Sequence, residues 1–403
     1  MHAFKSFVTF VFSVILVADA ADIINSADKR NVIPDSFIVV MKKGISDAAF
    51  ALHLNKTAEA HQASAALSGN AAITGVKHSY QINGWKGYSG VFNAATLNVI
   101  RNNKDVDFIE PDRMASVAAW TTQPNAPSWG LARISQRVPR NRNYVFDDAA
   151  GRGIIVYGLD SGIFLQHPDF QGRATFGVNT VGGSDNDNHG HGTHTAGTIV
   201  GVGYGVAKKA HIIAVKVLGD DGRGPWSGII QGVEWAVNDA RRRGIQNRAV
   251  INMSIGGARE EAVNQAVNAA NDAGLFVVVS AGNDAIDTVR VSPGSAERVC
   301  TVAASDERDN RATFSNYGAP VKIYAPGTNI RSTLRTGGVG PMSGTSMSAP
   351  HVAGQGAIVL SMFPGARANT LCEHLRRTAI PSVPNPGPRT TNLLLYNGSP
   401  NGQ

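Results

Sequence analysis

Residues 154–162 read Ile154-Ile-Val-Tyr-Gly-Leu159-Asp160-Ser161-Gly162, an apolar run that stops at an aspartate. Runs without polar alternation are typical of strands in a parallel sheet whose two faces are both covered by helices. Similar runs follow at 211–218, 249–255, 275–280 and 298–303. In such sheets functional groups gather at the carboxyl ends of the strands. Asp160 is therefore a candidate site residue, although an aspartate at a strand end is more often a turn or cap residue.

Helical patterns alternate with these strands and predict an α/β domain. The predicted helices cover 191–201, 227–243, 260–273, 345–363 and 369–379. In the second of them Ser227 is the expected N-cap, and Gly244 is the expected stop.

The N-terminal part of the chain predicts a leader and a separate small domain. Residues 1–20 are typical of a secretory signal peptide, because Lys5 precedes an apolar run and Ala18-Asp19-Ala20 gives a small-residue cleavage pattern. The run is shorter than the ~20 residues that a membrane span needs, so we expect a secreted protein with no membrane partner. An apolar N-terminal helix of the fold is the alternative.

Residues 21–118 predict a small α+β unit. The expected order is strand 36–42, helix 46–67, strand 88–93, helix 95–102 and strand 106–109. This order is typical of a ferredoxin-like sandwich. A small-residue linker at 115–119 then predicts a boundary, and the second domain would span 119–403.

Composition excludes several function classes. The 403 residues are 43% hydrophobic and 17% charged, which is ordinary for a globular chain and excludes general disorder. Lys and Arg total 37 against 30 Asp and Glu, a net charge of +7. The basic residues are scattered, and the tight run 241–243 ends a predicted helix, where cations favour the dipole. A nucleic-acid partner is not expected.

Three histidines open one predicted helix in His189-Gly-His191-Gly-Thr-His194. They could ligate zinc, or one could be a general base while the others are structural. Helical zinc motifs place two ligands four residues apart with a glutamate between them, which this spacing lacks. We favour His191 as the base, and expect His189 and His194 to be hydrogen-bonded supports.

Ser343-Gly-Thr-Ser346-Met-Ser-Ala-Pro350 runs directly into an apolar helix. Ser346 would lie in the first turn, where unpaired N–H groups stabilise a developing anion, although Thr345 or Ser346 could merely cap the helix. An imidazole can take the proton of such a serine if a carboxylate holds the imidazole in place. The strand before Asn283 brings a side-chain amide that could donate to an oxyanion.

These segments together resemble the subtilases, the subtilisin-like serine proteases, and among them the fungal proteinase K branch. The likeness spans roughly residues 119–396. The segments that carry it are Trp129-Gly-Leu-Ala-Arg-Ile-Ser135, Gly158-Leu-Asp160-Ser-Gly-Ile163, His191-Gly-Thr-His-Thr-Ala-Gly197, Ser280-Ala-Gly-Asn283 and Gly344-Thr-Ser346-Met-Ser-Ala-Pro350.

The resemblance implies a role for each matching residue. Ser346 would be the nucleophile, His191 the base, Asp160 its orienter and Asn283 the oxyanion donor. The implied substrate-binding residues are Gly222, Gly224, Trp226, Ser254, Ile255, Gly256 and Gly282. The glycines would leave a deep slot for a bulky apolar or aromatic residue before the scissile bond. Trp226 could instead be a plain core aromatic.

The resemblance also implies that residues 21–118 are an inhibitory propeptide, cleaved by the enzyme itself near Ala118–Ala119. The expected product is a monomeric endopeptidase that acts on proteins and peptides. A decayed, non-enzymatic relative and a serine esterase are the alternatives. An esterase would place its serine in Gly-x-Ser-x-Gly, in the chain order serine, acid, histidine, and this chain has neither feature.

Four further expectations come from single residues. Cys300 and Cys372 stand where the branch has a disulfide, whereas Thr195 replaces the thiol often found beside the catalytic histidine. Lys322 stands where the branch has a calcium-binding aspartate, and a lysine cannot ligate a cation. We expect no required cofactor and no metal residues; a structural calcium held by the backbone carbonyls near Glu297 and Val299 is the alternative. Asn397 and Asn252 fit the glycosylation pattern, and burial would leave Asn252 unmodified.

Overall fold

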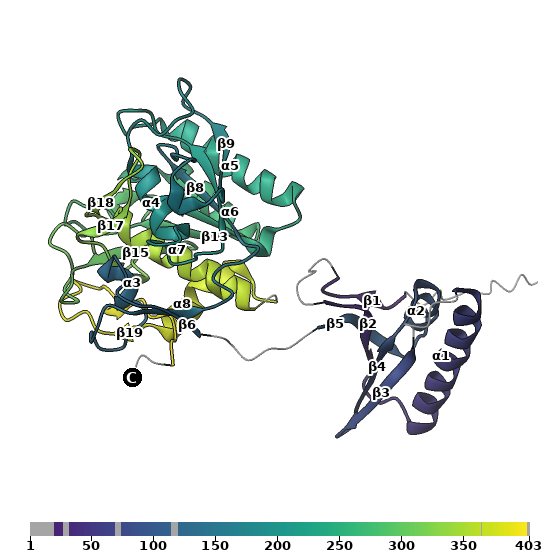
Figure 1. Cartoon of the computed structure of the whole chain (residues 1–403). Helices are drawn as coiled ribbons and strands as arrows, with labels where there is room; N and C mark the ends of the chain where they lie inside the picture. The colour runs from purple at the N-terminus through teal and green to yellow at the C-terminus, as the bar shows by residue number, and fades with distance from the viewer. Residues whose placement is uncertain (1–19, 27–31, 69–73, 114–119, 364, 401–403) are drawn as a thin grey trace, which may run out of the picture. The chain divides into compact units, whose positions relative to one another are not determined.

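The computed structural model describes residues 20–26, 32–68, 74–113, 120–363 and 365–400. The predicted signal peptide, apart from Ala20, and the predicted cleavage point lie outside these residues. The chain divides into two compact units, Met1–Val117 and Ala118–Gln403 (Figure 1). This division lies one residue from the predicted boundary.

Within the described residues, the first unit is a five-stranded sheet with two helices, as expected of an α+β sandwich. Its strands are β1 (Asp22–Ile23), β2 (Val32–Met41), β3 (Gly75–Ile82), β4 (Trp85–Val91) and β5 (Val106–Arg113), in the order β1-β5-β2-β4-β3. Its helices are α1 (Asp47–Ser68) and α2 (Ala94–Arg101). Phe50 of α1 and Ile100 of α2 share one core with Val39, Tyr88 and Ile109 of the sheet.

Two strands of this unit are absent from the sequence prediction. β1 has two residues, and β3 carries mostly exposed polar side chains at the edge of the sheet. An edge strand of this kind lacks the apolar alternation by which strands are recognised.

The second unit contains the predicted parallel sheet. Its nine strands are β8 (Ile155–Asp160), β9 (Ala174–Asn179), β10 (His211–Lys216), β11 (Ala249–Met253), β13 (Phe276–Ser280), β15 (Cys300–Ser305), β16 (Ile323–Pro326), β19 (Ile380–Pro381) and β20 (Leu393–Leu394). They lie in the order β19-β20-β16-β15-β13-β11-β8-β10-β9. All neighbours are parallel except β19 and β20.

Helices cover both faces of this sheet (Figure 1). They are α3 (Trp129–Arg133), α4 (His191–Val200), α5 (Trp226–Arg242), α6 (Glu261–Asp272), α7 (Thr345–Met362) and α8 (Leu371–Thr378). Alternate strand residues face opposite cores: Val156 packs in the cluster that contains α4 and α7 residues, and Tyr157 packs in the cluster that contains α5 and α6 residues. The predicted α/β fold, a parallel sheet covered by helices on both faces, is confirmed.

Short elements complete the second unit. Two-stranded pairs are formed by β6 (Trp120–Gln123) with β7 (Tyr144–Asp147), β12 (Gly257–Ala258) with β14 (Val291–Ser292), and β17 (Ile330–Thr333) with β18 (Val339–Met342). Turns of 3-10 helix occur at Pro168–Phe170, Gln246–Arg248, Thr288–Arg290 and Ala368–Thr370.

The start of α5 differs from the prediction. Pro225 is the N-cap, the helix begins at Trp226, and Ser227 lies inside the first turn. Proline fixes a φ that suits the start of a helix and has no N–H to satisfy. The predicted stop at Gly244 agrees with its φ of +65°, which glycine adopts readily.

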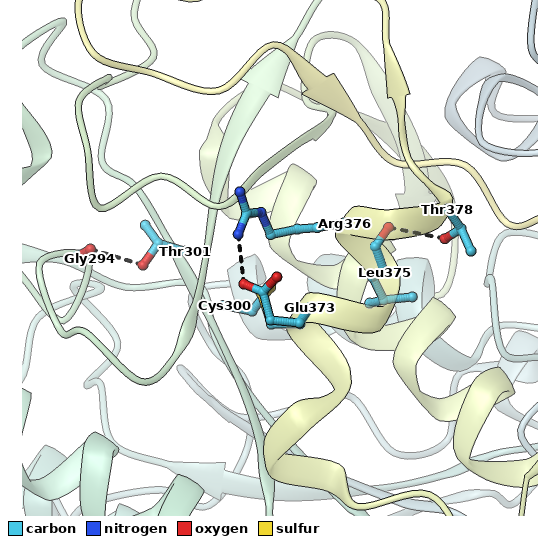
Figure 2. Close-up of a disulfide and its surroundings, with 8 residues drawn as sticks. Gly294, Cys300, Thr301, Glu373, Leu375, Arg376 and Thr378 are labelled. Atoms are coloured by element: carbon cyan, nitrogen blue, oxygen red, sulfur yellow. Dashed lines mark hydrogen bonds and ion pairs between the residues drawn. A yellow bond between two sulfur atoms is a disulfide. The ribbon is translucent and has the colours of Figure 1, made fainter.

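The predicted disulfide is confirmed between Cys300, the first residue of β15, and Cys372 in α8. Their Cα atoms lie 5.5 Å apart. Figure 2 shows the surroundings, where Arg376 pairs with Glu373 at 2.6 Å on the same helix. The bond fastens the short helix α8 to strand β15 of the sheet.

Candidate active site

The end of β8 and the start of α4 bring the predicted carboxylate and imidazole together. His191 Nδ1 lies 2.7 Å from Asp160 Oδ1. The Asp160 side chain is buried, and its two oxygens also accept from Ser161 N at 2.8 Å and Thr195 Oγ1 at 3.3 Å. Gly192 permits this approach, because a Cβ there would lie 2.1 Å from the Gly162 carbonyl oxygen. The carboxylate therefore has a fixed orientation toward the ring.

The environment of His191 favours its protonated form. Burial alone would lower the pKa of His191, but the charge and hydrogen bond of Asp160, with a smaller contribution from Asp187, raise it above its ordinary value. A base with a raised pKa takes a proton more readily, and the same carboxylate stabilises the imidazolium that results.

The two neighbouring histidines behave differently from each other. His194 is buried, its Nε2 lies 3.1 Å from the Gly340 carbonyl oxygen, and burial lowers its pKa to about 4. It is therefore a neutral support, as predicted. His189 is exposed and lines a cavity beside His191, with no hydrogen bond from its ring among the described residues. The prediction that His189 is a hydrogen-bonded support is wrong, because its loop turns the ring toward the cavity.

Ser346 lies in the first turn of α7, as expected from the small-residue run. Its hydroxyl donates to the carbonyl oxygen of Ser254 at 3.0 Å, and Ser254 Oγ donates to the carbonyl oxygen of Ser346 at 2.8 Å. Pro350 explains the second bond: it has no N–H, so the helix supplies no donor to the carbonyl four residues earlier. Among the described residues no hydrogen bond joins Ser346 to His191. A rotation about the Cα–Cβ bond would redirect the hydroxyl.

Asn283 follows β13 and is oriented by a residue that sequence reasoning missed. Thr345 donates to Asn283 Oδ1 twice, from its N at 2.8 Å and its Oγ1 at 2.9 Å. Because the amide oxygen is used in this way, the Nδ2 group remains available as a donor. The position of Thr345 next to Ser346 was the only signal for this role.

Two cavities adjoin these residues. One of about 530 Å³ is lined by Ser346, Asn283, Gly282 and Gly256, with Val291 and Arg290 among its other residues. The second, of about 480 Å³, is lined by His189, His191, Gly222, Gly224, Trp226, Ser254, Ile255 and Gly256. All seven predicted substrate-binding residues thus line one of the two, and both volumes suit a side chain or short peptide. Trp226 also packs on Gly257 and on the core beneath α5.

Lys322 stands at the position where the resemblance places a calcium ligand. Lys322 is half-buried and its backbone N donates to the Thr301 carbonyl oxygen at 2.9 Å. An ammonium there does not fit a calcium site, and the described residues contain no cluster of three acidic, histidine or cysteine side chains that could hold a metal ion.

The glycosylation candidates are both engaged in hydrogen bonds. Asn252 is buried in β11 and donates to Ser254 Oγ at 3.1 Å, whereas Asn397 is half-buried and donates to the Val145 carbonyl oxygen at 2.6 Å. Both stay predictions. No helix of the described residues is sufficiently long and apolar to cross a bilayer.

The chain order of the three site residues indicates the class of protein to which the chain belongs. The carboxylate, imidazole and hydroxyl come from a strand end and two helix starts of one parallel sheet, in the chain order acid, histidine, serine. That order on a doubly covered sheet is typical of serine hydrolases of the subtilisin type, and it differs from the order in α/β-hydrolases.

Comparison with known proteins gives the family. Residues 151–402 match the subtilase family, and residues 36–118 match the peptidase inhibitor I9 family. The chain therefore belongs to the subtilases, a family of serine proteases, and carries an I9-type propeptide region.

Two of the similar proteins cover nearly all of the chain. A subtilisin-like protease of Coccidioides posadasii (strain C735) is 52% identical, across 97% of this chain and 98% of its own length. Subtilisin-like protease 11 of Arthroderma benhamiae is 49% identical, across 99% and 100%. The crystal structure of a cold adapted subtilisin-like serine proteinase has 40% identity and a TM-score of 0.64, and covers 68% of this chain and 98% of that one. The subtilisin-like fold is thus shown.

Proposed function

We propose that the protein is a secreted, self-processing serine endopeptidase in which Ser346 attacks the peptide carbonyl. His191 takes the hydroxyl proton as the bond to the carbonyl carbon forms, then passes it to the leaving amine as the C–N bond breaks. A water molecule then attacks the acyl group in the same way, with His191 again as the base, and frees the acyl group from Ser346. Asp160 orients His191 throughout.

The observation that carries this proposal is the 2.7 Å contact between His191 Nδ1 and Asp160 Oδ1. It leaves Nε2 as the ring nitrogen that can exchange a proton with Ser346. The helix N-terminus at Ser346 and the Asn283 amide, held by Thr345, then provide donors for the negative charge of the tetrahedral intermediate.

The cavities support a preference among substrates. Small residues Gly256, Gly257 and Gly282 line the cavity beside Ser346, so we propose that it receives a bulky apolar or aromatic side chain before the scissile bond. The three residues of the segment Gly222–Gly224 are exposed or half-buried and line the second cavity. A substrate would add to it as an extended strand.

The family assignment supports the remaining proposals. Residues 1–20 would direct secretion, and residues 21–118 would inhibit the enzyme until cleavage near Ala118–Ala119. The mature chain would act as a monomer on proteins and peptides, with no nucleic acid or membrane partner. No metal would be required, because Lys322 stands at the position that the resemblance gives to a calcium ligand.

Expression of the wild type and Ser346→Ala tests the proposal. N-terminal sequencing should find wild-type protein beginning near Ala119 and active on casein and a peptide anilide. The Ser346→Ala protein should keep its propeptide and be inactive. Ser343→Ala is the matched control, since this exposed serine three residues earlier donates nothing to the site. Full activity of Ser346→Ala would contradict the proposal, and an inactive wild type would favour a decayed, non-enzymatic protein.

A further inference from the structure

A second carboxylate lies behind the proposed catalytic residues. Asp187 is 5% exposed and accepts four hydrogen bonds. Its Oδ1 accepts from Ser161 Oγ at 2.8 Å and Gly190 N at 2.7 Å, and its Oδ2 accepts from Thr193 N at 2.8 Å and Thr193 Oγ1 at 2.5 Å. Four donors use all the lone pairs of a carboxylate, so this group is held in one orientation.

Two of these bonds fix the start of the helix that carries His191. The N-cap of α4 is Gly190, which has no side chain and adopts a φ of +99°. An N-cap side chain normally accepts from the N–H two or three positions into the helix. Asp187 does this in place of Gly190 by accepting from Thr193 N, and it also accepts from Gly190 N itself. His191 is the first residue of α4, and Asp187 thereby fixes the backbone on both sides of it.

A third bond to Asp187 comes from Ser161 Oγ, and Ser161 in turn contacts Asp160. Ser161 is fully buried, and its N donates to Asp160 Oδ1 at 2.8 Å while its Oγ donates to Asp187. The same Oγ accepts from Gly192 N at 3.0 Å, next to His191. Lys216 Nζ donates to the Ser161 carbonyl oxygen at 2.6 Å. Every polar atom of Ser161 is therefore used, and this residue connects Asp187 to both His191 and Asp160.

We propose that Asp187 is a positioning residue for catalysis, which sets the distance and angle between the Asp160 carboxylate and the His191 ring by holding the start of α4 and Ser161 together. This inference rests on the proposed function, because it concerns the same acid–base pair. Asp187 touches neither the reacting atoms nor the cavities, so it is not itself catalytic.

The charge of Asp187 gives the proposal a second readout. The titratable and charged groups near His191 are Asp160 of β8, Asp187, His189 at a ring separation of 6.2 Å, His194 of α4, and Arg335, whose stem packs on Gly190. Asp187 is one of the groups that raise the pKa of His191. Loss of this charge should therefore lower that pKa.

The test compares Asp187→Asn with Asp185→Asn in the mature enzyme. Asp185 is an exposed carboxylate two residues away in the same loop, where its Oδ1 accepts from Asn179 Nδ2, so the control makes the same charge change without the buried contacts. Hydrolysis of a peptide anilide is measured against pH, and rates are normalised by titration with a serine-directed inhibitor. We expect Asp187→Asn to lower kcat by between about tenfold and a hundredfold with little change in KM, and to move the acid limb of kcat/KM to lower pH. Asp185→Asn should change neither.

A second variant separates geometry from charge and covers a failure of Asp187→Asn to fold. Ser161→Ala keeps the Asp187 charge and removes its connection to Asp160 and Gly192, so kcat should fall while the acid limb stays in place. The inference is overturned if Asp187→Asn matches Asp185→Asn in kcat and pH profile, or if Ser161→Ala keeps wild-type kcat. Either result with an active wild type would leave the proposed function standing, whereas an inactive wild type would remove both.

Discussion

The hydroxyl of Ser254 donates to the carbonyl oxygen of Ser346 at 2.8 Å, and the hydroxyl of Ser346 donates to the carbonyl oxygen of Ser254 at 3.0 Å. This reciprocal pair joins the first turn of α7 to the segment that follows β11. Pro350 makes the first of these two bonds necessary, because proline has no N–H and leaves the Ser346 carbonyl without a helical donor. The proposed nucleophile is thus held by the wall of the cavity that its substrate would enter.

Ser254→Ala should destabilise the fold by about 1–3 kcal/mol, since it leaves the Ser346 carbonyl without its side-chain donor. Pro350→Ala restores a backbone N–H four residues after Ser346. The loss caused by Ser254→Ala should therefore be smaller when Pro350→Ala is also present. Urea unfolding of the inhibited enzyme and its variants measures this coupling, and strictly additive changes would contradict it.

Thr345→Val should reduce kcat about fivefold and leave KM nearly unchanged. The hydroxyl contributes one of the two hydrogen bonds that orient Asn283 Oδ1, and one such bond is worth about 1 kcal/mol. The loss falls on the transition state because the Asn283 amide acts on charge that develops there. Thr345→Ser keeps the hydroxyl and serves as the control; an equal loss in both variants would indicate a packing defect.

Stability should fall as the pH drops from about 6.5 to about 4. His194 and His351 are fully buried, and burial lowers the pKa of each to about 4. The folded state therefore keeps both rings neutral where the unfolded chain takes up protons. Their contribution, up to about 3 kcal/mol for each, is complete above the unfolded pKa and is lost as the pH falls through the folded one. The raised pKa of His191 acts above this range: its stabilisation is complete below the unfolded value of 6.5 and is lost as the pH rises through the folded pKa.

Denaturant unfolding of the inhibited enzyme across this pH range measures that dependence. His351→Asn removes one of the titrating groups, so its stability should change less steeply with pH than that of the wild type. A wild-type free energy of unfolding that is constant from pH 7 to 4 would show that these rings do not control acid stability.

Removal of the disulfide should destabilise the mature domain by about 2–4 kcal/mol, because the bond closes a long loop of the unfolded chain. The two cysteines are 72 residues apart in sequence. Cys372→Ser is compared with the wild type by thermal unfolding, with and without a reductant. The reductant should lower the Tm of the wild type alone, and an unchanged Tm would mean that the bond contributes little.

Chelation should leave stability unchanged, because the ammonium of Lys322 stands where the family resemblance places a calcium-binding carboxylate. The Tm of the inhibited mature enzyme is measured in EDTA and in excess calcium. Equal values support a calcium-independent fold. A clear loss of Tm in EDTA would show that a metal is bound elsewhere in the chain.

Much of the fold could be predicted from local patterns. Continuous apolar runs such as 154–159 predicted central strands, and small-residue turns before apolar runs predicted the helices that begin at His191 and near Ser346. Predictions failed where local pattern is weak: β3 is an exposed edge strand, and α5 begins at Trp226, after Pro225 as N-cap, although Ser227 is the residue type that usually caps a helix. Boundaries of this kind depend on backbone geometry rather than on apolar periodicity.

The sequence by itself determined which chemical groups are present and the order in which the strands and helices carry them, because apolar periodicity and chain order are properties of neighbouring residues. Tertiary structure alone decided that Asp160 and His191 lie 2.7 Å apart, that Thr345 orients Asn283, that His189 lines a cavity and that Asp187 connects to Ser161. These contacts depend on side-chain directions and on packing between segments far apart in the chain. No local pattern specifies either of them.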